Sequence, residues 1–476
     1  MQTQMAETRD SEYSARNSED RGTYGDNRDS QVRGAARARG FTRRGLSRVG
    51  VSAGAGAGVL ALAACGVGGA AEQATSKTQQ PVTVAYMSNL AETHPEGAAR
   101  IKLLTEYNAT NKDQITVDLG GGRDATPVDK YKALAAGGTP PDVIFTAYTD
   151  AADMFASGML TDIDTELKSD KDWVKQRADI FPAMLDSSTW QGKLASVPIY
   201  TNDVAMIYNK GLLQQAGVQP PKEGWTWDDF KVTAAKFVRP DITVLSMNWV
   251  FWVNWLRTTG ATPVSADSKK ITVDTAESLQ VLELIQGFIR SGIAPADGKT
   301  ETYRDAKNDV VFEVQGPYRI PTFRQNNAPD FGVIHLPVHP QKKQIVTNNG
   351  GHNMAIFKGV TPERRVAASR VVKWMNDVHA QAQICIQATS LPVSKAAQNS
   401  KELQDYLKTD PQLKGFIDLA PYGWRWPALP SLGKITGALN ANVTKVLKQE
   451  IGVKDGLTTA QREAQLFLDD DVKRMS

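Results

Sequence analysis

A cluster of three aromatic residues and an arginine near the C-terminal end is the first candidate for ligand chemistry. Tyr422, Trp424, Arg425 and Trp426 lie in residues 421–427, a stretch that also contains one Gly and two Pro. A flat ring can cover the C–H face of a sugar, and polar side chains can bind the hydroxyls at its edge. The residues alone leave two interpretations open: the rings stack on a ligand, or the loop caps the core.

A second group of aromatic residues has helical spacing. Trp249, Trp252 and Trp255 recur every third residue, a pattern typical of the buried face of a helix. We expect this stripe to pack in the core. Trp249, at the start of the expected helix, is the member that could instead reach a ligand.

Further candidate binding residues follow the ends of expected strands or lie in two long extended stretches. They are Asn89, Glu92, His94, Tyr148, Asp150, Tyr200, Asn202, Asp203, Tyr318, Arg319, Gly351, His352 and Asn353. Charge-assisted hydrogen bonds are about twice as strong as neutral ones, so the carboxylates of Asp150 and Asp203 suit paired hydroxyls. Asp203 could instead bond backbone at a hinge, and His352 could be a turn residue in a Gly-rich loop.

Several other chemistries are not supported by the residues present. Five His and two Cys in separate places leave little material for a metal cage. His335 and His339 are four apart, but Pro337 between them favours extended chain over a helix. The glycines at 120–122 with Arg123 lack the Lys-Ser/Thr ending of a P-loop. We therefore expect no catalytic metal, no cofactor and no nucleotide hydrolysis.

The candidates need a framework that brings strand ends together. Residues 81–86 and 115–119 alternate with period two, as strands do, and 96–108 carry apolar residues at helical spacing. A short helix at 130–136 precedes a buried strand at 141–146. This order predicts an α/β fold with a mainly parallel, doubly wound sheet, whose ligands bind at the carboxyl ends of the strands.

A second unit opens where Thr226 stands three residues before Asp229, close to a capping box at a helix start. Strands are expected at 310–314 and 331–337, and one long amphipathic helix over 362–382. Extended stretches cross between the two units twice, which predicts two lobes joined by a hinge. The expected boundaries are 81–202 and 348–397 for lobe 1, and 203–347 and 398–476 for lobe 2.

Composition excludes other classes of protein. The chain has 476 residues, 41% of them hydrophobic, which is enough for two or three domains with an ordinary core. Lys and Arg number 55 against 52 Asp and Glu, so the strong positive field of nucleic-acid-binding proteins is missing and we expect no nucleic-acid partner.

The N-terminal residues have the composition of a leader. Residues 1–44 contain almost no aliphatic side chains and are expected to be disordered. Arg43 and Arg44 precede a weakly apolar run too short for a spanning helix, which ends in Leu-Ala-Ala-Cys at 62–65. This order resembles a twin-arginine export signal followed by a lipoprotein signal-peptidase box. The resemblance implies cleavage after residue 64, diacylation of Cys65 and a flexible tether over 65–80, although a permanent signal anchor would also use an apolar run.

Five motifs in the body carry a resemblance to a known family. They are Thr-Pro-Pro-Asp-Val-Ile-Phe at 139–145, Phe-Ala-Ser-Gly-Met-Leu-Thr-Asp-Ile-Asp at 155–164, Val-Pro-Ile-Tyr-Thr-Asn-Asp-Val-Ala-Met-Ile-Tyr-Asn-Lys at 197–210, Trp-Thr-Trp-Asp-Asp-Phe at 225–230 and Gly-Gly-His-Asn-Met-Ala-Ile at 350–356. In order and spacing they resemble the extracellular solute-binding proteins of ATP-driven carbohydrate importers, the family of maltose-binding protein. The similarity covers nearly all of residues 82–470.

This resemblance implies a type II periplasmic-binding-protein fold, in which two α/β lobes close by hinge motion on a ligand between them. Each lobe is expected to be a mainly parallel sheet flanked by helices. It further implies a carbohydrate ligand, delivery to the transmembrane subunits of an ABC permease, a monomer, and a lipid anchor in the outer leaflet of the cytoplasmic membrane. The family's segment before a late helix lines the cleft, which favours Trp424 and Trp426 as stacking platforms.

Three other functions stay open. A polyol phosphate such as glycerol phosphate could bind if Arg319, Arg425, Arg123 and His94 formed a positive cleft. An envelope glycoside hydrolase would need two carboxyl groups roughly 5–9.5 Å apart across the cleft. A surface adhesion protein would present its aromatic residues on an exposed face. We expect a binding protein rather than an enzyme.

Overall fold

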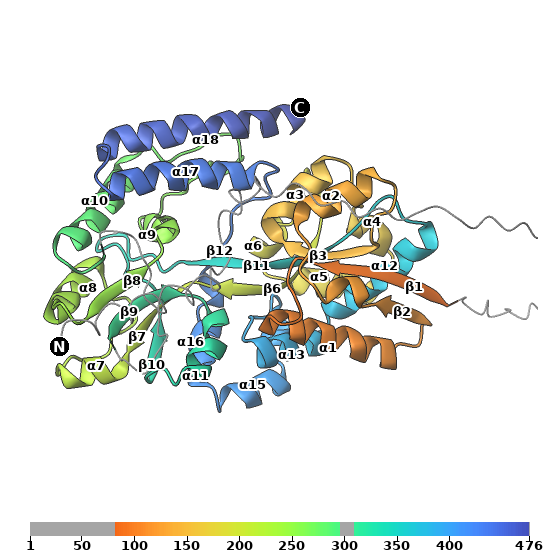
Figure 1. The fold of residues 1–476 in the computed structure, drawn as a ribbon, viewed down its shortest axis with the longest axis horizontal. Helices are drawn as coiled ribbons and strands as arrows, with labels where there is room; N and C mark the ends of the chain where they lie inside the picture. The colour runs from red at the N-terminus through yellow and green to blue at the C-terminus, as the bar shows by residue number, and fades with distance from the viewer. Residues whose placement is uncertain (1–80, 296–308, 476) are drawn as a thin grey trace, which may run out of the picture. The chain divides into compact units, whose positions relative to one another are not determined.

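The first sheet of the body forms from the strand and helix alternation that the sequence predicts. The computed structural model describes residues 81–295 and 309–475 (Figure 1). The leader, Arg43, Arg44, Cys65 and the tether lie outside these described residues. The chain begins with β1 (Val82–Ser88), α1 (Pro95–Thr110), β2 (Ile115–Asp118), α2 (Val128–Ala136) and β3 (Val143–Ala147). β1 pairs in parallel with both β2 and β3, so the predicted β-α-β-α-β unit is confirmed.

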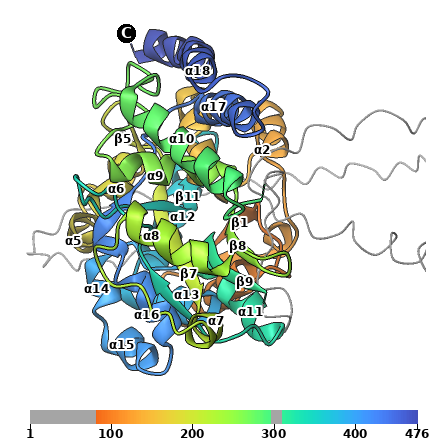
Figure 2. The same ribbon diagram turned by 90° about the vertical axis from the view of Figure 1, so that its left-hand side faces the viewer.

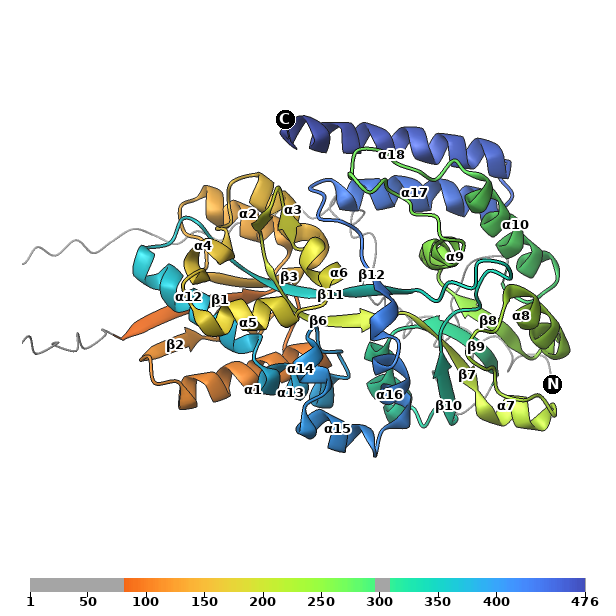
Figure 3. The same ribbon diagram turned by 180° about the vertical axis from the view of Figure 1, so that it is seen from behind.

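Three further strands complete this sheet. β11 (Thr347–Ile356) runs antiparallel to both β3 and β6 (Val197–Asp203), and it pairs in parallel with β12 (Gly423–Trp424). Figure 3 shows β6, β11 and β12 as neighbours. The two extended stretches of the sequence therefore lie side by side, joined by backbone hydrogen bonds.

A second sheet has the order β10-β7-β9-β8. Its strands are β7 (Ala205–Asn209), β8 (Thr243–Met247), β9 (Val310–Gln315) and β10 (Phe331–Ile334). β7 is antiparallel to β9 and β10, and only β8 and β9 pair in parallel. This sheet is therefore mixed, unlike the mainly parallel sheet expected in each lobe. The chain enters this sheet directly from β6 into β7.

The remaining helices cover the two sheets (Figures 1 and 2). Between β3 and β4 lie α3 (Tyr148–Ala156), α4 (Ile163–Leu167), α5 (Lys171–Asp179) and α6 (Pro182–Asp186), and between β11 and β12 lie α12 (Pro362–Met375), α13 (Val378–Ala388), α14 (Lys395–Gln398), α15 (Lys401–Leu407) and α16 (Pro411–Ile417). The others are α7 (Lys210–Gln215), α8 (Trp227–Ala234), α9 (Trp252–Thr258), α10 (Ala276–Arg290), α11 (Ile320–Gln325), α17 (Leu432–Leu447) and α18 (Val453–Met475). α17 and α18 pack along each other, and none of the helices in the described ranges is long and apolar enough to cross a membrane.

Short elements complete the chain. A two-stranded sheet joins β4 (Thr189–Trp190) to β5 (Lys193–Leu194). Single 3-10 turns are η1 (Gly120–Gly122), η2 (Ala235–Phe237), η3 (Trp249–Phe251), η4 (Pro317–Arg319) and η5 (Ala420–Tyr422). The capping box predicted at the start of α8 is present, since Thr226 and Asp229 each bond the other's backbone N–H. Such a pair satisfies two donors that the helix start would otherwise leave unpaired.

The long helix predicted over 362–382 is wrong in one respect, because it is divided into α12 and α13. Asn376 ends α12, and its side-chain amide donates to the carbonyl oxygen of Pro198 at 2.6 Å. Asp377 then caps α13 by accepting from the backbone N–H of His379. A tertiary hydrogen bond and a new cap thus stop the helix at a point where the apolar pattern continues.

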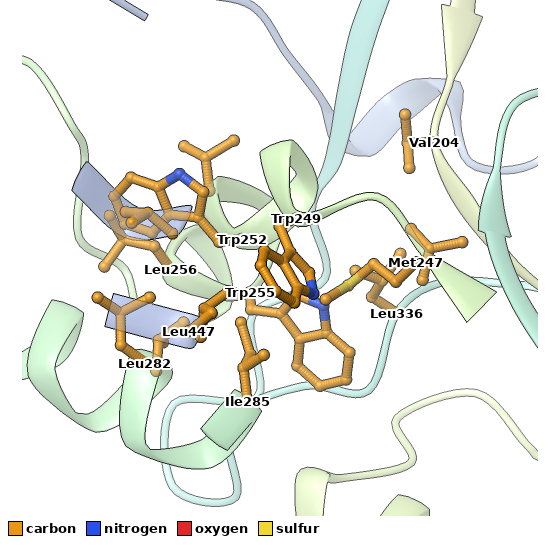
Figure 4. Close-up of a cluster of buried hydrophobic side chains, with 14 of the residues drawn as sticks. Val204, Met247, Trp249, Trp252, Trp255, Leu256, Leu282, Ile285, Leu336 and Leu447 are labelled. Atoms are coloured by element: carbon orange, nitrogen blue, oxygen red, sulfur yellow. The ribbon is translucent and has the colours of Figure 1, made fainter. Parts of the chain in front are cut away.

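The tryptophan stripe packs in the larger core, as expected (Figure 4). Trp252 and Trp255 are fully buried, and Trp249 is 7% exposed. All three belong to one apolar cluster with Met247 and Leu282. Burial of such rings stabilises the fold mainly through apolar surface removed from water.

Candidate functional site

The start of α1 places two titratable side chains at the carboxyl end of β1. His94 is the N-cap, and its Nδ1 accepts from the backbone N–H of Glu96 at 3.3 Å. Pro95 occupies the first turn, where its missing N–H costs nothing. A Cβ at Gly97 would lie 1.9 Å from the carbonyl oxygen of Ala91. The loop before the helix therefore packs onto the helix so closely that only glycine fits.

Glu96 is a buried carboxylate with three hydrogen-bond donors. Tyr200 Oη donates to its Oε2 at 2.6 Å. Asn202 Nδ2 and Ser390 Oγ donate to its Oε1 at 3.0 and 2.6 Å. Burial by itself would raise the pKa of Glu96, but His352 and these three donors leave that pKa lowered. Charge-assisted hydrogen bonds of this kind are what make a buried carboxylate tolerable.

His352 on β11 connects to the same carboxylate through Tyr200. Its Nδ1 lies 2.8 Å from Tyr200 Oη, and its ring stacks on Phe145 with centroids 5.1 Å apart. Burial lowers the pKa of His352 to about 4. The ring is therefore neutral near pH 7 and has one N–H donor and one nitrogen acceptor.

Asn202 and Asp203 end β6, the strand that crosses from the first sheet toward the second. Both are buried, with Asp203 fully enclosed and Asn202 7% exposed. Asn202 Oδ1 is buried and makes no hydrogen bond to the described residues. β11 runs alongside, with Gly350 opposite Asn202. The strand pairing thus holds the predicted residues of both crossings next to each other.

Arg425 fastens the aromatic loop to the two crossing strands. Its Nη2 donates to the carbonyl oxygen of Gly350 at 2.6 Å and to that of Tyr200 at 3.3 Å. Its guanidinium carbon lies 4.7 Å from the ring centroid of Tyr148, at the start of α3. The side chain is only 4% exposed, so Arg425 binds backbone and an aromatic face within the protein.

Gly351 adopts a backbone conformation that requires glycine. Its φ is +133°, and a Cβ there would lie 2.3 Å from the carbonyl oxygen of Tyr200 and 2.5 Å from Arg425 Nη2. The close approach of β6, β11 and Arg425 therefore depends on the absence of a side chain.

Two acidic residues near strand ends have different surroundings. Asp150 in the first turn of α3 accepts from Thr146 Oγ1 at 3.5 Å, and burial raises its pKa to about 6. Glu92 in the loop after β1 is partly exposed and forms an ion pair with Arg123. Asp150 is thus the better placed of the two to act as a desolvated hydrogen-bonding group.

The loop that carries Asn89, Glu92 and His94 is held by a buried cation. Arg100 Nη2 donates to the carbonyl oxygen of Leu90 at 3.0 Å, and its guanidinium carbon lies 4.3 Å from the ring centroid of Phe145. The backbone N–H of Asn89 donates to the Phe145 carbonyl oxygen. The side-chain oxygen of Asn89, Oδ1, is buried and makes no hydrogen bond to the described residues. The loop is thus fastened at both its start and its middle.

The aromatic candidates divide by burial. Trp426 is 7% exposed and belongs to the larger apolar cluster, as does Trp249. Trp424 is half-buried against this cluster, with its ring centroid 5.3 Å from that of Trp426 and 5.2 Å from the guanidinium carbon of Arg257. Tyr422 is 38% exposed. Trp424 is therefore the tryptophan of the loop with surface left for a ligand, while Trp426 and Trp249 pack as core residues do.

Tyr318 and Arg319 lie in η4, after β9. Tyr318 Oη donates to Gln315 Oε1 at 2.6 Å, and the Arg319 guanidinium carbon is 6.0 Å from the Tyr318 ring centroid. Pro317, at the start of this turn, accepts from Thr389 Oγ1 through its carbonyl oxygen. Tyr318 and Arg319 therefore lie just after the end of β9, a strand of the second sheet.

The contacts given above bring together Tyr148, Tyr200, Asn202, Gly351, His352 and Arg425. Trp249 packs in the same apolar cluster as Tyr148, and Tyr422 is exposed. Sequence reasoning missed Glu96 and Ser390, which complete the cluster. An acidic residue in a first helical turn is common, so Glu96 gave no signal of its burial. Among the described residues no His/Cys/Asp/Glu group could hold a metal, and a surface hollow of about 340 Å³ at Gln219–Trp225 contains none of the predicted residues.

Comparison with known proteins identifies the family. A family model for bacterial extracellular solute-binding proteins matches residues 102–414. The chain belongs to this family. The maltotriose-binding protein of Pyrococcus abyssi is 23% identical to this solute-binding protein over 325 residues, 67% of this chain and 68% of the relative.

Solved structures show the same fold as this solute-binding protein. The cyclic alpha-maltosyl-1,6-maltose binding protein from Arthrobacter globiformis superposes with a TM-score of 0.71 at 20% identity, covering 82% of this chain and 100% of that one. UgpB from Mycobacterium tuberculosis, in complex with glycerophosphocholine, gives 0.67 at 19% identity, covering 82% and 99%. The predicted type II periplasmic-binding-protein fold with two α/β lobes is confirmed. The domain boundaries and site residues stay predictions.

Proposed function

We propose that this solute-binding protein captures a carbohydrate between its two lobes and delivers it to the permease of an ABC importer. The observation that carries the proposal is the family match over residues 102–414 together with a maltotriose-binding relative. The polar cluster at the crossing strands supports it, because the Asn202 amide and the neutral His352 ring are uncharged hydrogen-bonding groups of the kind that suit sugar hydroxyls. The proposal includes no catalytic step.

Export and lipid anchoring complete the proposed function. Residues 62–65 have the order Leu-Ala-Ala-Cys, and Arg43 and Arg44 precede the apolar run. We propose that Cys65 carries the lipid and that the body stands outside the cytoplasmic membrane as a monomer. A receptor for an importer must meet its ligand on that side, so location and function agree.

A polyol phosphate is the second candidate ligand, because the UgpB structure contains glycerophosphocholine. A phosphate needs cationic groups that are free to converge on it. Arg425 is committed to two carbonyl oxygens, and Arg123 pairs with Glu92. These contacts occupy two of the three arginines expected to form a positive cleft, which favours the carbohydrate.

Thermal unfolding and calorimetry with the full chain test the proposal. The probes are maltotriose, other malto-oligosaccharides, simple monosaccharides, glycerol 3-phosphate and glycerophosphocholine. A ligand at 100 times its dissociation constant adds about 2.7 kcal/mol of stability, which is readily seen. We expect stabilisation by a sugar and none by either phosphate compound. If only a phosphate compound stabilises the protein, the carbohydrate proposal is wrong and a polyol phosphate is the ligand. If none of the probes stabilises it, both proposed ligand classes are contradicted.

A further inference from the structure

One carboxylate lies where three separate segments of the chain meet. Glu96 comes from the start of α1, Tyr200 and Asn202 come from β6, and Ser390 follows α13. Glu96 is 4% exposed, so its two oxygens have little access to water. A carboxylate only accepts hydrogen bonds when ionised, so all three neighbours must donate to it.

This requirement fixes the direction of hydrogen bonding beyond Glu96. Because the Tyr200 hydroxyl proton points to Glu96 Oε2, its oxygen must accept from His352 Nδ1, 2.8 Å away. His352 then carries its proton on Nδ1. Its Nε2, which makes no hydrogen bond to the described residues, is left as an acceptor.

The same requirement orients the amide of Asn202. Its Nδ2 faces Glu96 Oε1 at 3.0 Å, so its Oδ1 must point away. That oxygen is buried and has no hydrogen-bond partner in the described part of the chain, in a side chain more than nine-tenths enclosed. An unsatisfied buried acceptor is costly, so Asn202 Oδ1 needs a hydrogen-bond partner that the described residues do not supply.

We propose that Glu96 is a positioning residue that turns Asn202 Oδ1 and His352 Nε2 into a pair of acceptors for the hydroxyl donors of the ligand. This rests on the proposed function and deepens it, because the site then selects neutral polyhydroxyl compounds. A phosphate dianion offers no donor and would meet two lone pairs near a carboxylate. Glu96 itself need not touch the ligand.

The first experiment measures the direction of hydrogen bonding without any ligand. Nitrogen-15 NMR of the full chain with labelled histidine distinguishes the two neutral tautomers, and the five His make assignment practical, with His352→Gln identifying the signal. We expect the Nδ1–H form in the wild type at pH 7. In Tyr200→Phe, which removes the acceptor, we expect a shift toward Nε2–H. An Nε2–H ring in the wild type would overturn the inference.

The second experiment tests the consequence for binding. In Glu96→Gln one oxygen becomes an NH2 donor, so either His352 changes tautomer or Asn202 turns its amide, and each rearrangement converts an acceptor into a donor. We expect the affinity for maltotriose, measured by calorimetry, to fall at least about tenfold. Glu277→Gln is the matched control: Glu277 also occupies the first turn of a helix, α10, but is exposed. It should bind as the wild type does.

The two experiments fail separately. A folded Glu96→Gln that binds maltotriose as tightly as the wild type would refute the positioning role. If the wild type binds no sugar while His352 is in the Nδ1–H form and shifts in Tyr200→Phe, the carbohydrate proposal fails and the hydrogen-bond direction stands. Should Glu96→Gln not fold, Tyr200→Phe still decides between the two tautomers.

Discussion

Replacing Gly351 by alanine tests whether the close approach of the two crossing strands requires glycine. The added Cβ would lie 2.3 Å from the Tyr200 carbonyl oxygen and 3.0 Å from the Thr201 Cα, well inside van der Waals contact. The Arg425 guanidinium, 2.5 Å away, could move aside, but the backbone of β6 could not do so without breaking its pairing with β11.

The magnitude follows from two contributions. A φ of +133° is a conformation that residues with a Cβ rarely adopt, and such strain costs about 1–3 kcal/mol. Separation of the strands would remove at least one backbone hydrogen bond, worth about 0.5–1.5 kcal/mol. We expect Gly351→Ala to lower the free energy of unfolding by about 2–4 kcal/mol.

Urea unfolding followed by tryptophan fluorescence measures this change, and Gly437→Ala is the control. Gly437 lies within α17, where a Cβ would meet nothing within 4 Å. Alanine there should stabilise the protein by about 0.5–1 kcal/mol, since glycine is a poor helix residue. The two substitutions should therefore act in opposite directions. A Gly351→Ala protein as stable as the wild type, or equal losses in both variants, would refute the reasoning.

Three further predictions concern other parts of the chain. Trp426→Ala should lower the free energy of unfolding by about 3–5 kcal/mol because its ring is in the core. Trp424→Ala should mainly reduce sugar affinity, by about 1–3 kcal/mol. If thermal melting shows the larger loss of stability for Trp424→Ala, and calorimetry shows the larger loss of affinity for Trp426→Ala, the two assignments are reversed. Burial alone would lower the pKa of His379, but Glu402 and Glu106 raise it. Its stabilising contribution is therefore complete below the ordinary histidine pKa and disappears as pH rises through the raised value; His379→Asn should flatten this slope in urea titrations at several pH values. Cys65→Ser should release the protein from membranes with its melting temperature unchanged, and its retention in the membrane fraction would remove the lipoprotein proposal.

The sequence by itself was sufficient for features that depend on neighbours along the chain. Alternation with period two located β1 and β2, helical spacing located α1, and Thr226 with Asp229 marked the start of α8. The Trp252 and Trp255 stripe indicated a buried helix face, which the structure confirms. These patterns are readable because backbone geometry repeats every two or 3.6 residues.

Only the tertiary structure decided what depends on residues far apart in sequence. Ser390 donates to Glu96 across 294 positions, and Arg425 reaches the Gly350 carbonyl across 75. The division of the 362–382 helix depends on Asn376 bonding Pro198, 178 positions away. No local pattern encodes such contacts, because each residue has an ordinary role in its own segment. A glutamate in a first helical turn becomes a buried hydrogen-bond acceptor only when β6 and the segment after α13 enclose it.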